Sequence, residues 1–226
     1  MGSWTTVDRL PADPAGLRIS YDRGALTEES APAEPFTLFA HWFADAVDAG
    51  LPDPNAMVLA TSSADGRPRA RTVLLKGFGE EGFRFFTNHT SRKGADLAEN
   101  PWASLLFPWH PLQRQVIVMG RAERLPQEES AAYFRSRPYG SQLGAWASRQ
   151  SSVIADRGEL ENRFSELTER WPKPDSVPVP TFWGGYLVIP DSIEFWQGRP
   201  DRLHDRLRYT REHSPAGSWL RERLAP

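Results

Sequence analysis

The chain has 226 residues, of which 39% are hydrophobic and 25% charged, with a formal net charge of −2 at pH 7 and no cysteine. This composition is typical of a soluble globular protein that is large enough to bury a core, and it excludes disulfides, thiolate metal sites and cysteine nucleophiles. The near-neutral charge also argues against a nucleic-acid binder that works by bulk neutralisation of phosphates.

Metal and membrane functions are not expected either. The five histidines include no close-spaced pair of the kind found on metal-binding helices, so we predict no metal centre. The sequence has no run of about 18 apolar residues and no N-terminal signal peptide. We therefore expect a cytoplasmic protein without a membrane partner.

The N-terminal region is predicted to consist of a tail and one helix. Residues 1–16 show little periodicity and are expected to be a flexible tail, followed by a single domain over residues 17–226. An amphipathic helix is predicted to begin after Pro35 and to end at Gly50. The apolar positions that recur at helical spacing are Phe36, Phe39, Ala40, Phe43 and Val47.

Short β-rich segments separated by turn signals follow this helix. They favour a mostly β protein with flanking helices, built on an antiparallel sheet or small barrel rather than on βαβ units. The predicted strands cover residues 56–63, 69–78, 83–88, 102–109, 114–125, 184–190, 192–198 and 199–211, with 218–226 as a further candidate. Three helices are predicted over residues 91–100 with Ser91 as N-cap, 126–137 and 157–171.

The last long segment, 199–211, is dense in charge but alternates as a strand would. The period of two places one set of side chains on the face opposite Leu203, Asp205 and Leu207. That set is Arg202, His204, Arg206 and Arg208. Local cation clusters in a protein without a basic excess point to small anions as ligands.

Two other basic segments each allow two interpretations. In residues 69–76, alternation places Arg71 and Lys76 on opposite faces, so one strand can serve two anions; the alternative is an edge strand with charged residues that prevent aggregation. In residues 90–94 a strand gives way to a helix, where backbone N–H groups, a serine and two cations can bind a phosphate. The alternative there is a solvated turn with an ordinary serine cap.

A third cluster combines a phenol, a guanidinium and a hydroxyl. Tyr133 and Arg137 are four residues apart on a predicted helix, and the turn after it can return Ser141 toward them as a phosphate site. A surface helix end is the alternative. Gln115 and the aromatic and amide groups of 144–152 and 193–198 suit a flat heteroaromatic cofactor, although packing alone also explains such residues.

Taken together, several long motifs closely resemble the pyridoxine/pyridoxamine 5′-phosphate oxidase family, in order from about Leu17 to Pro226. The motifs are "RTVLLKGF", "FFTNHTSRKG", "LLFPWHPLQRQV", "YFRSRPYGSQLGAWASRQSS", "FWGGYLVIPDSIEFWQGRPDRLHDR" and the final "RLAP". The resemblance implies a split β-barrel homodimer with FMN at the subunit interface. It also implies oxidation of pyridoxine 5′-phosphate or pyridoxamine 5′-phosphate to pyridoxal 5′-phosphate by O₂, with release of H₂O₂ and, from the amine, ammonia.

The resemblance also implies roles for individual residues. It assigns the flavin site to Arg71, Thr72, Val73, Leu74, Leu75, Lys76, Phe86, Thr87, Arg92, Lys93, Gln115, Gln150, Ser151, Trp196 and Arg206. It assigns the substrate site to Lys76, Tyr133, Arg137 and Ser141 around the phosphate, Arg202 and His204 over the ring, and Arg18 and Tyr21 in an N-terminal lid. The catalytic candidates are Arg202 and His204, which would orient the substrate and assist proton transfer.

One position departs from the family pattern, and two rival functions remain. Phe86 stands where a familiar form of the family has tyrosine, so any role of that hydroxyl is lost. The first rival is a related FMN-dependent oxidase that acts on another ring, such as those of phenazine biosynthesis. The second is a carrier that binds flavin or pyridoxal phosphate without turnover.

Overall fold

The computed structural model describes residues 16, 17, 19–211 and 218–226. Arg18 and residues 1–15 lie outside these residues, so the predicted tail and domain boundary stay predictions. The helices are α1 (Pro35–Asp48), α2 (Arg92–Glu99), α3 (Gln127–Ser136), α4 (Tyr139–Ala147) and α5 (Arg157–Arg170). The strands are β1 (Ala56–Ser62), β2 (Pro68–Leu74), β3 (Gly77–Gly79), β4 (Gly82–Asn88), β5 (Trp102–Trp109), β6 (Arg114–Arg124), β7 (Trp183–Gln197), β8 (Asp205–Arg211) and β9 (Trp219–Arg223).

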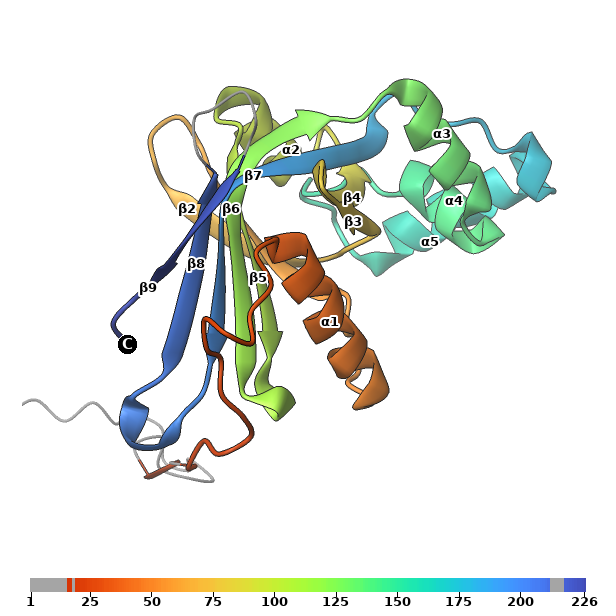
Figure 1. Ribbon diagram of the computed structural model, residues 1–226. Coiled ribbons are helices and arrows are strands. Elements are labelled where there is room, and N and C mark those ends of the chain that lie inside the picture. The colour runs from red at the N-terminus through yellow and green to blue at the C-terminus, as the bar shows by residue number, and fades with distance from the viewer. Residues whose placement is uncertain (1–15, 18, 212–217) are drawn as a thin grey trace, which may run out of the picture.

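Within the described residues the strands form one antiparallel sheet, in the order β2-β1-β5-β6-β7-β4-β3. The long strand β7 organises it: β6 pairs along nearly its whole length, β4 pairs with its first half, and β8 pairs with its second half. The sheet therefore branches at β7 and curls, as Figure 1 shows. This is the split-barrel architecture expected from the sequence.

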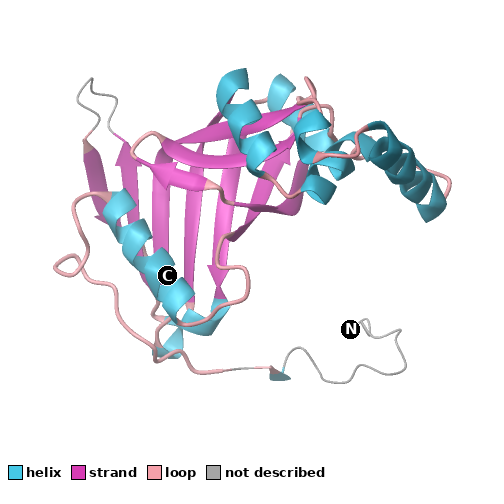
Figure 2. Ribbon diagram, turned by 90° about the vertical axis from the view of Figure 1, so that its right-hand side faces the viewer, coloured by secondary structure: helices cyan, strands magenta, loops and turns pink. Residues whose placement is uncertain are grey.

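Helix α1 lies across one face of the sheet and closes the main core (Figure 2). Phe39 is fully buried, and its ring meets those of Phe83 and Phe107 edge-on with centroids 4.9 and 5.0 Å apart. Each such buried side chain contributes about 1.5–3 kcal/mol to folding. The helix prediction is confirmed, but Val47, expected on the apolar face, is 49% exposed, and Trp42 packs on the sheet instead.

Helices α3, α4 and α5 form a second unit, the helical lobe, beside the first half of β7 (Figure 1). It has its own apolar cluster, in which Phe134 of α3 and Leu143 of α4 are fully buried. Trp183, the first residue of β7, joins this cluster and so links the lobe to the sheet. Helix α4 was not among the predicted elements, because its mixture of glycine, serine and aromatic residues has weak helical periodicity.

The strand predicted over 199–211 begins only at Asp205, and this corrects the expected row of four cations. Residues 200–202 instead form a short 3₁₀ turn in which Asp201 and Arg202 adopt left-handed conformations, with φ of 56° and 64°. Two consecutive residues with positive φ cannot continue a strand. Leu203, expected on the strand face opposite the cations, lies outside the strand and is 70% exposed.

Two other boundaries differ from the sequence predictions, and one candidate strand is confirmed. Residues 184–190 and 192–198 are parts of one strand, β7, because Pro190 lies beside an irregularity in the pairing with β6 rather than in a turn. The strand predicted over 69–78 is divided into β2 and β3. The candidate strand at the C-terminus is confirmed as β9.

Candidate functional site

A cavity of about 950 Å³ lies between β2, β4, the start of α2 and the helical lobe. Most of the residues predicted to bind the flavin or the substrate phosphate line it. They are Arg71, Thr72, Val73, Leu74, Lys76, Phe86, Thr87, Arg92, Lys93, Tyr133, Arg137, Ser141, Gln150 and Ser151. Leu75 does not line it, because its side chain is buried in the core, and Gln115, Trp196 and Arg206 do not line it either.

One end of the cavity is built on the N-terminus of α2. Ser91 caps the helix by accepting a hydrogen bond from the Gly94 amide, as the sequence predicted. The first turn presents Arg92 and Lys93 to the cavity. Backbone N–H groups and the helix dipole at this end favour an anion.

Lys93 is a nearly buried cation, only 9% exposed. Burial, together with the positive charge of Arg71, lowers its pKa from 10.5 to about 8. Its Nζ donates hydrogen bonds to Gln150 Oε1 at 2.8 Å and Ser91 Oγ at 3.2 Å, both of which are neutral groups. Lys93 and Arg71 are two neighbouring cations, and each disfavours the charged form of the other inside the protein. A bound dianion would offset this repulsion.

Hydrogen bonds to the neighbouring strand β1 orient the Arg71 guanidinium. Its Nη1 donates to Thr61 Oγ1 at 2.7 Å and to the Leu59 carbonyl at 3.0 Å. The buried Asp96 of α2 accepts a hydrogen bond from Thr61 and lies 3.8 Å from Arg71 Nη2. Asp96 also pairs with Arg69, so this carboxylate fixes two guanidinium groups at the rim of the cavity.

The loop after α4 closes this end of the cavity. Gln150 Oε1 accepts hydrogen bonds from Lys93 and from Thr87 of β4, and Ser151 Oγ accepts one from the Arg92 amide at 3.2 Å. Ser151 adopts a left-handed conformation with φ of 75°. The predicted cofactor residues 150 and 151 are therefore brought onto α2 by tertiary contacts.

The other end of the cavity carries a second cationic group on the helical lobe. Arg137 follows α3 directly, and its guanidinium lies over the Trp183 ring at 4.7 Å. Burial lowers its pKa, and among the described residues its buried Nη1 has no hydrogen-bond partner. Tyr133 stacks on Phe86 with ring centroids 4.0 Å apart, and Ser141 lies on the next helix. Arg137 lines the cavity, and a guanidinium whose burial lowers its pKa is suited to pair with an anion bound there.

The remaining predicted residues lie elsewhere in the protomer. Trp183 and Trp196 are near the two ends of the 15-residue strand β7, about 40 Å apart along an extended chain at roughly 3.3 Å per residue. The cavity lies at the Trp183 end. The group at the Trp196 end, called the strand-end group here, consists of Tyr21, Gln115, Trp196, Arg202, His204 and Arg206.

Strand register organises the strand-end group. Gln115 of β6 pairs with Trp196 of β7, and Trp196 pairs with Arg206 of β8, which gives one row across three strands. The Trp196 ring lies 4.6 Å from that of His204 and 5.9 Å from that of Tyr21. Arg206 is held by both carboxylate oxygens of Glu194, at 2.8 and 3.1 Å, and this ion pair raises its pKa.

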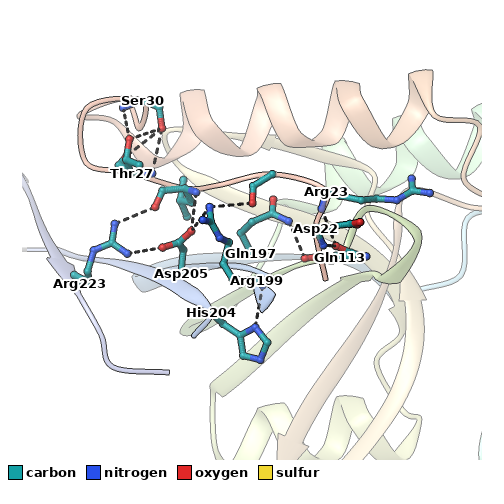
Figure 3. Close-up of polar contacts among 12 residues, drawn as sticks. Asp22, Arg23, Thr27, Ser30, Gln113, Gln197, Arg199, His204, Asp205 and Arg223 are labelled. Atoms are coloured by element: carbon teal, nitrogen blue, oxygen red, sulfur yellow. Dashed lines mark hydrogen bonds and ion pairs between the residues drawn. The ribbon is translucent and has the colours of Figure 1, made fainter. Parts of the chain in front are cut away.

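His204 has one ring nitrogen already occupied. The Arg199 amide donates a hydrogen bond to His204 Nδ1 at 3.1 Å (Figure 3). In a neutral imidazole with Nδ1 as acceptor, the proton is on Nε2. His204 therefore offers a hydrogen-bond donor, Nε2–H, to whatever lies beyond the ring.

Several contributors were not predicted from the sequence. The Trp183 ring packs against the Arg137 guanidinium. Asp96 lies beside Arg71, and Glu194 forms an ion pair with Arg206. Each is an isolated residue in a strand or helix, and its partner is distant in sequence, so no local pattern could reveal the pairing. Arg208, which had no predicted role, forms an ion pair with Glu222 across β8 and β9.

The described residues contain neither a group of three or more His, Cys, Asp or Glu side chains able to hold a metal ion nor a helix long and apolar enough to cross a membrane.

Lys76 and Arg71 were expected on opposite faces of one strand, yet both line the same cavity. Within β2 itself, residues of both alternating sets line the cavity, Arg71 and Val73 as well as Thr72 and Leu74, because β2 is the edge strand of the sheet.

Comparisons with known proteins agree with this geometry. The family model described as pyridoxamine 5′-phosphate oxidase matches residues 43–170, and the model for the pyridoxine 5′-phosphate oxidase C-terminal dimerisation region matches residues 183–226. Curated relatives called pyridoxine/pyridoxamine 5′-phosphate oxidase include one from Streptomyces avermitilis (54% identity, 97% of this chain and 99% of the relative). Another, from Frankia alni, is 56% identical over 95% of this chain and 89% of the relative.

Two solved structures are also similar. PhzG from Burkholderia lata, in complex with tetrahydrophenazine-1-carboxylic acid, aligns with a TM-score of 0.82 and 34% identity over 89% of this chain and 98% of that chain. A pyridoxamine 5′-phosphate oxidase-related, FMN-binding protein from Nostoc punctiforme aligns with a TM-score of 0.68 and 20% identity over 87% of this chain and 100% of that chain. The second likeness concerns the fold alone.

Proposed function

Because the chain belongs to the pyridoxine/pyridoxamine 5′-phosphate oxidase family, we propose that it oxidises pyridoxine 5′-phosphate or pyridoxamine 5′-phosphate to pyridoxal 5′-phosphate. FMN is the proposed cofactor and O₂ the electron acceptor. The products besides the aldehyde are H₂O₂ and, from the amine with uptake of water, ammonia. The observation that supports this most is a single cavity with two separate anion sites, one for each phosphate.

FMN fits the end of the cavity at α2. The helix N-terminus, the buried Lys93 and the oriented Arg71 are donors for a phosphate dianion, with Arg92 beside them. The edge strand β2 lines one side of the cavity with Thr72, Val73 and Leu74. The 950 Å³ volume lies at the upper end of the range for ligand pockets and admits two ligands at once.

The substrate phosphate is assigned to the other end, at the helical lobe. Arg137 with its unpaired Nη1, Tyr133, Ser141 and Lys76 line this part of the cavity. Charge-assisted hydrogen bonds of this kind contribute roughly 1.5–3 kcal/mol each. Such a grip fixes the register of the pyridine ring against a flavin, which is the main requirement for transfer between two bound molecules.

We assign the strand-end group to the same site through a homodimer. In one protomer it is separated from the cavity by most of β7. Four of its six residues, Trp196, Arg202, His204 and Arg206, lie within the matched dimerisation region, residues 183–226. A partner subunit that presents this group to the cavity would complete the site. Gln115, Trp196 and Arg206 would then contact the flavin, while Arg202 and His204 would contact the substrate, as would Tyr21 and Arg18, the latter outside the described residues.

Bound FMN, held by Arg71, Lys93 and the N-terminus of α2, would supply the hydride acceptor and the route for two electrons to O₂. The chain's own residues position and polarise the substrate. His204 donates from Nε2, because Nδ1 is occupied by the Arg199 amide, so its proposed role is to orient the reacting hydroxyl or amine and not to remove its proton. Arg202, exposed on its strained turn, supplies a cation that can approach the ring.

A visible spectrum tests the proposal most directly. We expect the purified protein to show flavin absorption that bleaches on anaerobic addition of pyridoxine 5′-phosphate and returns with air, together with aldehyde product and H₂O₂. The Arg202→Leu variant should lose kcat while keeping its flavin. A flavin that stays oxidised with both phosphorylated substrates would contradict the proposal.

The second candidate is a related oxidase that acts on an unphosphorylated ring, supported by the structural similarity to PhzG. A substrate without phosphate does not need the cationic group of Arg137, Lys76, Tyr133 and Ser141. Turnover of a tricyclic carboxylic acid, without turnover of the phosphorylated vitamers, would favour this candidate. A carrier without catalysis, the third alternative, would show no steady production of H₂O₂.

A further inference from the structure

Gln113 holds the backbone on both sides of Tyr21 as a clamp. Figure 3 shows its side chain beside Asp22 and Arg23. Its Oε1 accepts hydrogen bonds from the Asp22 amide at 2.9 Å and the Arg23 amide at 3.0 Å. Its Nε2 donates to the Ser20 carbonyl at 3.4 Å. One side chain, about 90 positions away in the sequence, therefore binds three successive peptide groups around this tyrosine.

The clamp is itself rigid. Gln113 is only 8% exposed and adopts a left-handed conformation with φ of 55°, between the 3₁₀ turn after β5 and the start of β6. Its carbonyl accepts hydrogen bonds from the Gly198 amide at 2.7 Å and from Gln197 Nε2 at 3.1 Å. Gln197 is fully buried, and its Oε1 accepts a hydrogen bond from Arg114. The backbone of Gln113 is thus fixed to the end of β7, next to the start of β6.

The clamp determines where the Tyr21 ring lies. The ring packs edge-on against Trp196 and His204, with centroids 5.9 and 5.7 Å away. Its seat also needs Gly198, because a Cβ at that position would approach Tyr21 Cγ to 2.8 Å. Tyr21 is therefore held against two residues of the strand-end group by backbone bonds on one side and a glycine on the other.

The following residues are anchored separately. The Leu26 amide donates to Asp205, and Arg199 donates to the Gly24 carbonyl (Figure 3). These bonds secure residues 24–26 without Gln113. Loss of the Gln113 amide would therefore release residues 20–23, which carry Tyr21, while the rest of the segment stays in place.

We infer that Gln113 is a positioning residue for the substrate: it holds Tyr21 in the orientation in which the tyrosine, next to His204, contacts the bound ring. This inference rests on the proposed function, since that function supplies the substrate. Gln113 touches neither ligand in this account. It acts only through the peptide groups around Tyr21.

The test uses a matched pair of variants in the flavin-loaded protein. Gln113→Asn keeps an amide and tolerates a positive φ, but it is one methylene too short to reach the segment. Gln113→Glu keeps the length and the acceptor oxygen for both amides. We expect Gln113→Asn to raise KM for pyridoxine 5′-phosphate roughly tenfold, the effect of losing one or two net hydrogen bonds, with kcat and flavin content nearly unchanged. Gln113→Glu should restore most of the loss, and Gln127→Ala on the exposed face of α3 is the control.

Two further measurements separate positioning from general destabilisation. In a Tyr21→Ala background, Gln113→Asn should cause no additional rise in KM, because its effect passes through Tyr21. Trypsin should cleave after Arg23 faster in Gln113→Asn than in wild type or Gln113→Glu. Additive effects on KM, equal loss in the Asn and Glu variants, or unchanged cleavage would overturn the inference. If the wild type turns over neither vitamer, the proposed function fails, and cleavage at Arg23 still decides whether the clamp exists.

Discussion

Replacing Lys93 by methionine should stabilise the flavin-free protein while weakening flavin binding. Lys93 is 9% exposed, and burial beside Arg71 lowers its pKa from 10.5 to about 8. At 1.36 kcal/mol per pKa unit, holding this ammonium charged at pH 7 costs about 3 kcal/mol relative to the unfolded chain. Methionine removes that cost and loses two hydrogen bonds, to Gln150 and Ser91, worth about 1 kcal/mol each. The expected net gain in the free energy of unfolding is about 1 kcal/mol.

The pH dependence of the free energy of unfolding tests independently whether the charged Lys93 destabilises the folded protein. Because the pKa is lowered on folding, the folded protein loses this proton near pH 8 while the unfolded chain keeps it to about 10.5. The unfolded state therefore binds more protons between these values, and the stability contribution of Lys93 in the wild type rises with pH across that window. The advantage of about 1 kcal/mol that Lys93→Met has below pH 8 should therefore fall by about 2 kcal/mol by pH 10, where the variant becomes less stable than the wild type by about 1 kcal/mol.

Denaturant unfolding of the deflavinated proteins at pH 7 and pH 10 measures both effects. Flavin titration followed by fluorescence quenching should show weaker FMN binding in Lys93→Met by about tenfold or more, the loss of one charge-assisted contact to phosphate. Arg67→Met, at an exposed residue with an ion pair to Asp65, is the control for charge removal alone. A Lys93→Met protein that is less stable than wild type by the same amount at both pH values would refute the reasoning.

Three other perturbations follow from the same geometry. Arg137→Leu should raise KM roughly tenfold or more and retain its flavin, because the lost guanidinium is proposed to bind the substrate phosphate. Steady-state kinetics measure KM, and flavin absorbance measures FMN content. Loss of FMN in this variant would mean that the two phosphate sites are exchanged. His204→Gln can still offer an N–H group near the position of Nε2, so kcat should stay within about tenfold of the wild-type value. If His204 were instead a general base, both His204→Gln and His204→Leu should lower kcat by about 10²–10⁴-fold. Burial lowers the pKa of His89 from 6.5 to about 4, so stability should fall by about 3 kcal/mol as pH drops through that window, and His89→Gln should flatten the pH profile of thermal unfolding.

Local patterns in the sequence were sufficient for most elements and for one end of the cavity. The helical spacing after Pro35 predicted α1, and Ser91 predicted the capped N-terminus of α2, which carries Lys93. Tyr133, Arg137 and Ser141 were grouped correctly because one turn separates α3 from α4, so residues close in sequence stay close in space. Such features depend on periodicity, capping and short turns, which act over a few residues.

The expected strand over 199–211 failed for a reason that alternation cannot reveal. The Arg199 amide bonds to His204 Nδ1, Arg199 also binds the Gly24 carbonyl and Asp205, and together these contacts accompany a turn with two left-handed residues. Bonds to residue 24 depend on how a distant segment packs. The local pattern of polar and apolar residues contains no information about that contact.

The sequence by itself determined the family, most of the strands and the basic segments of β2 and α2, because hydrophobic periodicity, caps and long motifs are all properties of neighbouring residues. Only the tertiary structure decided that Asp96 fixes Arg71 and Arg69, that Gln150 accepts a hydrogen bond from Lys93, and that the strand-end group lies at the far end of β7. It also decided that Gln113 holds the segment around Tyr21. These arrangements join residues tens of positions apart, and the curl of the sheet, not any local preference, brings them together or keeps them apart.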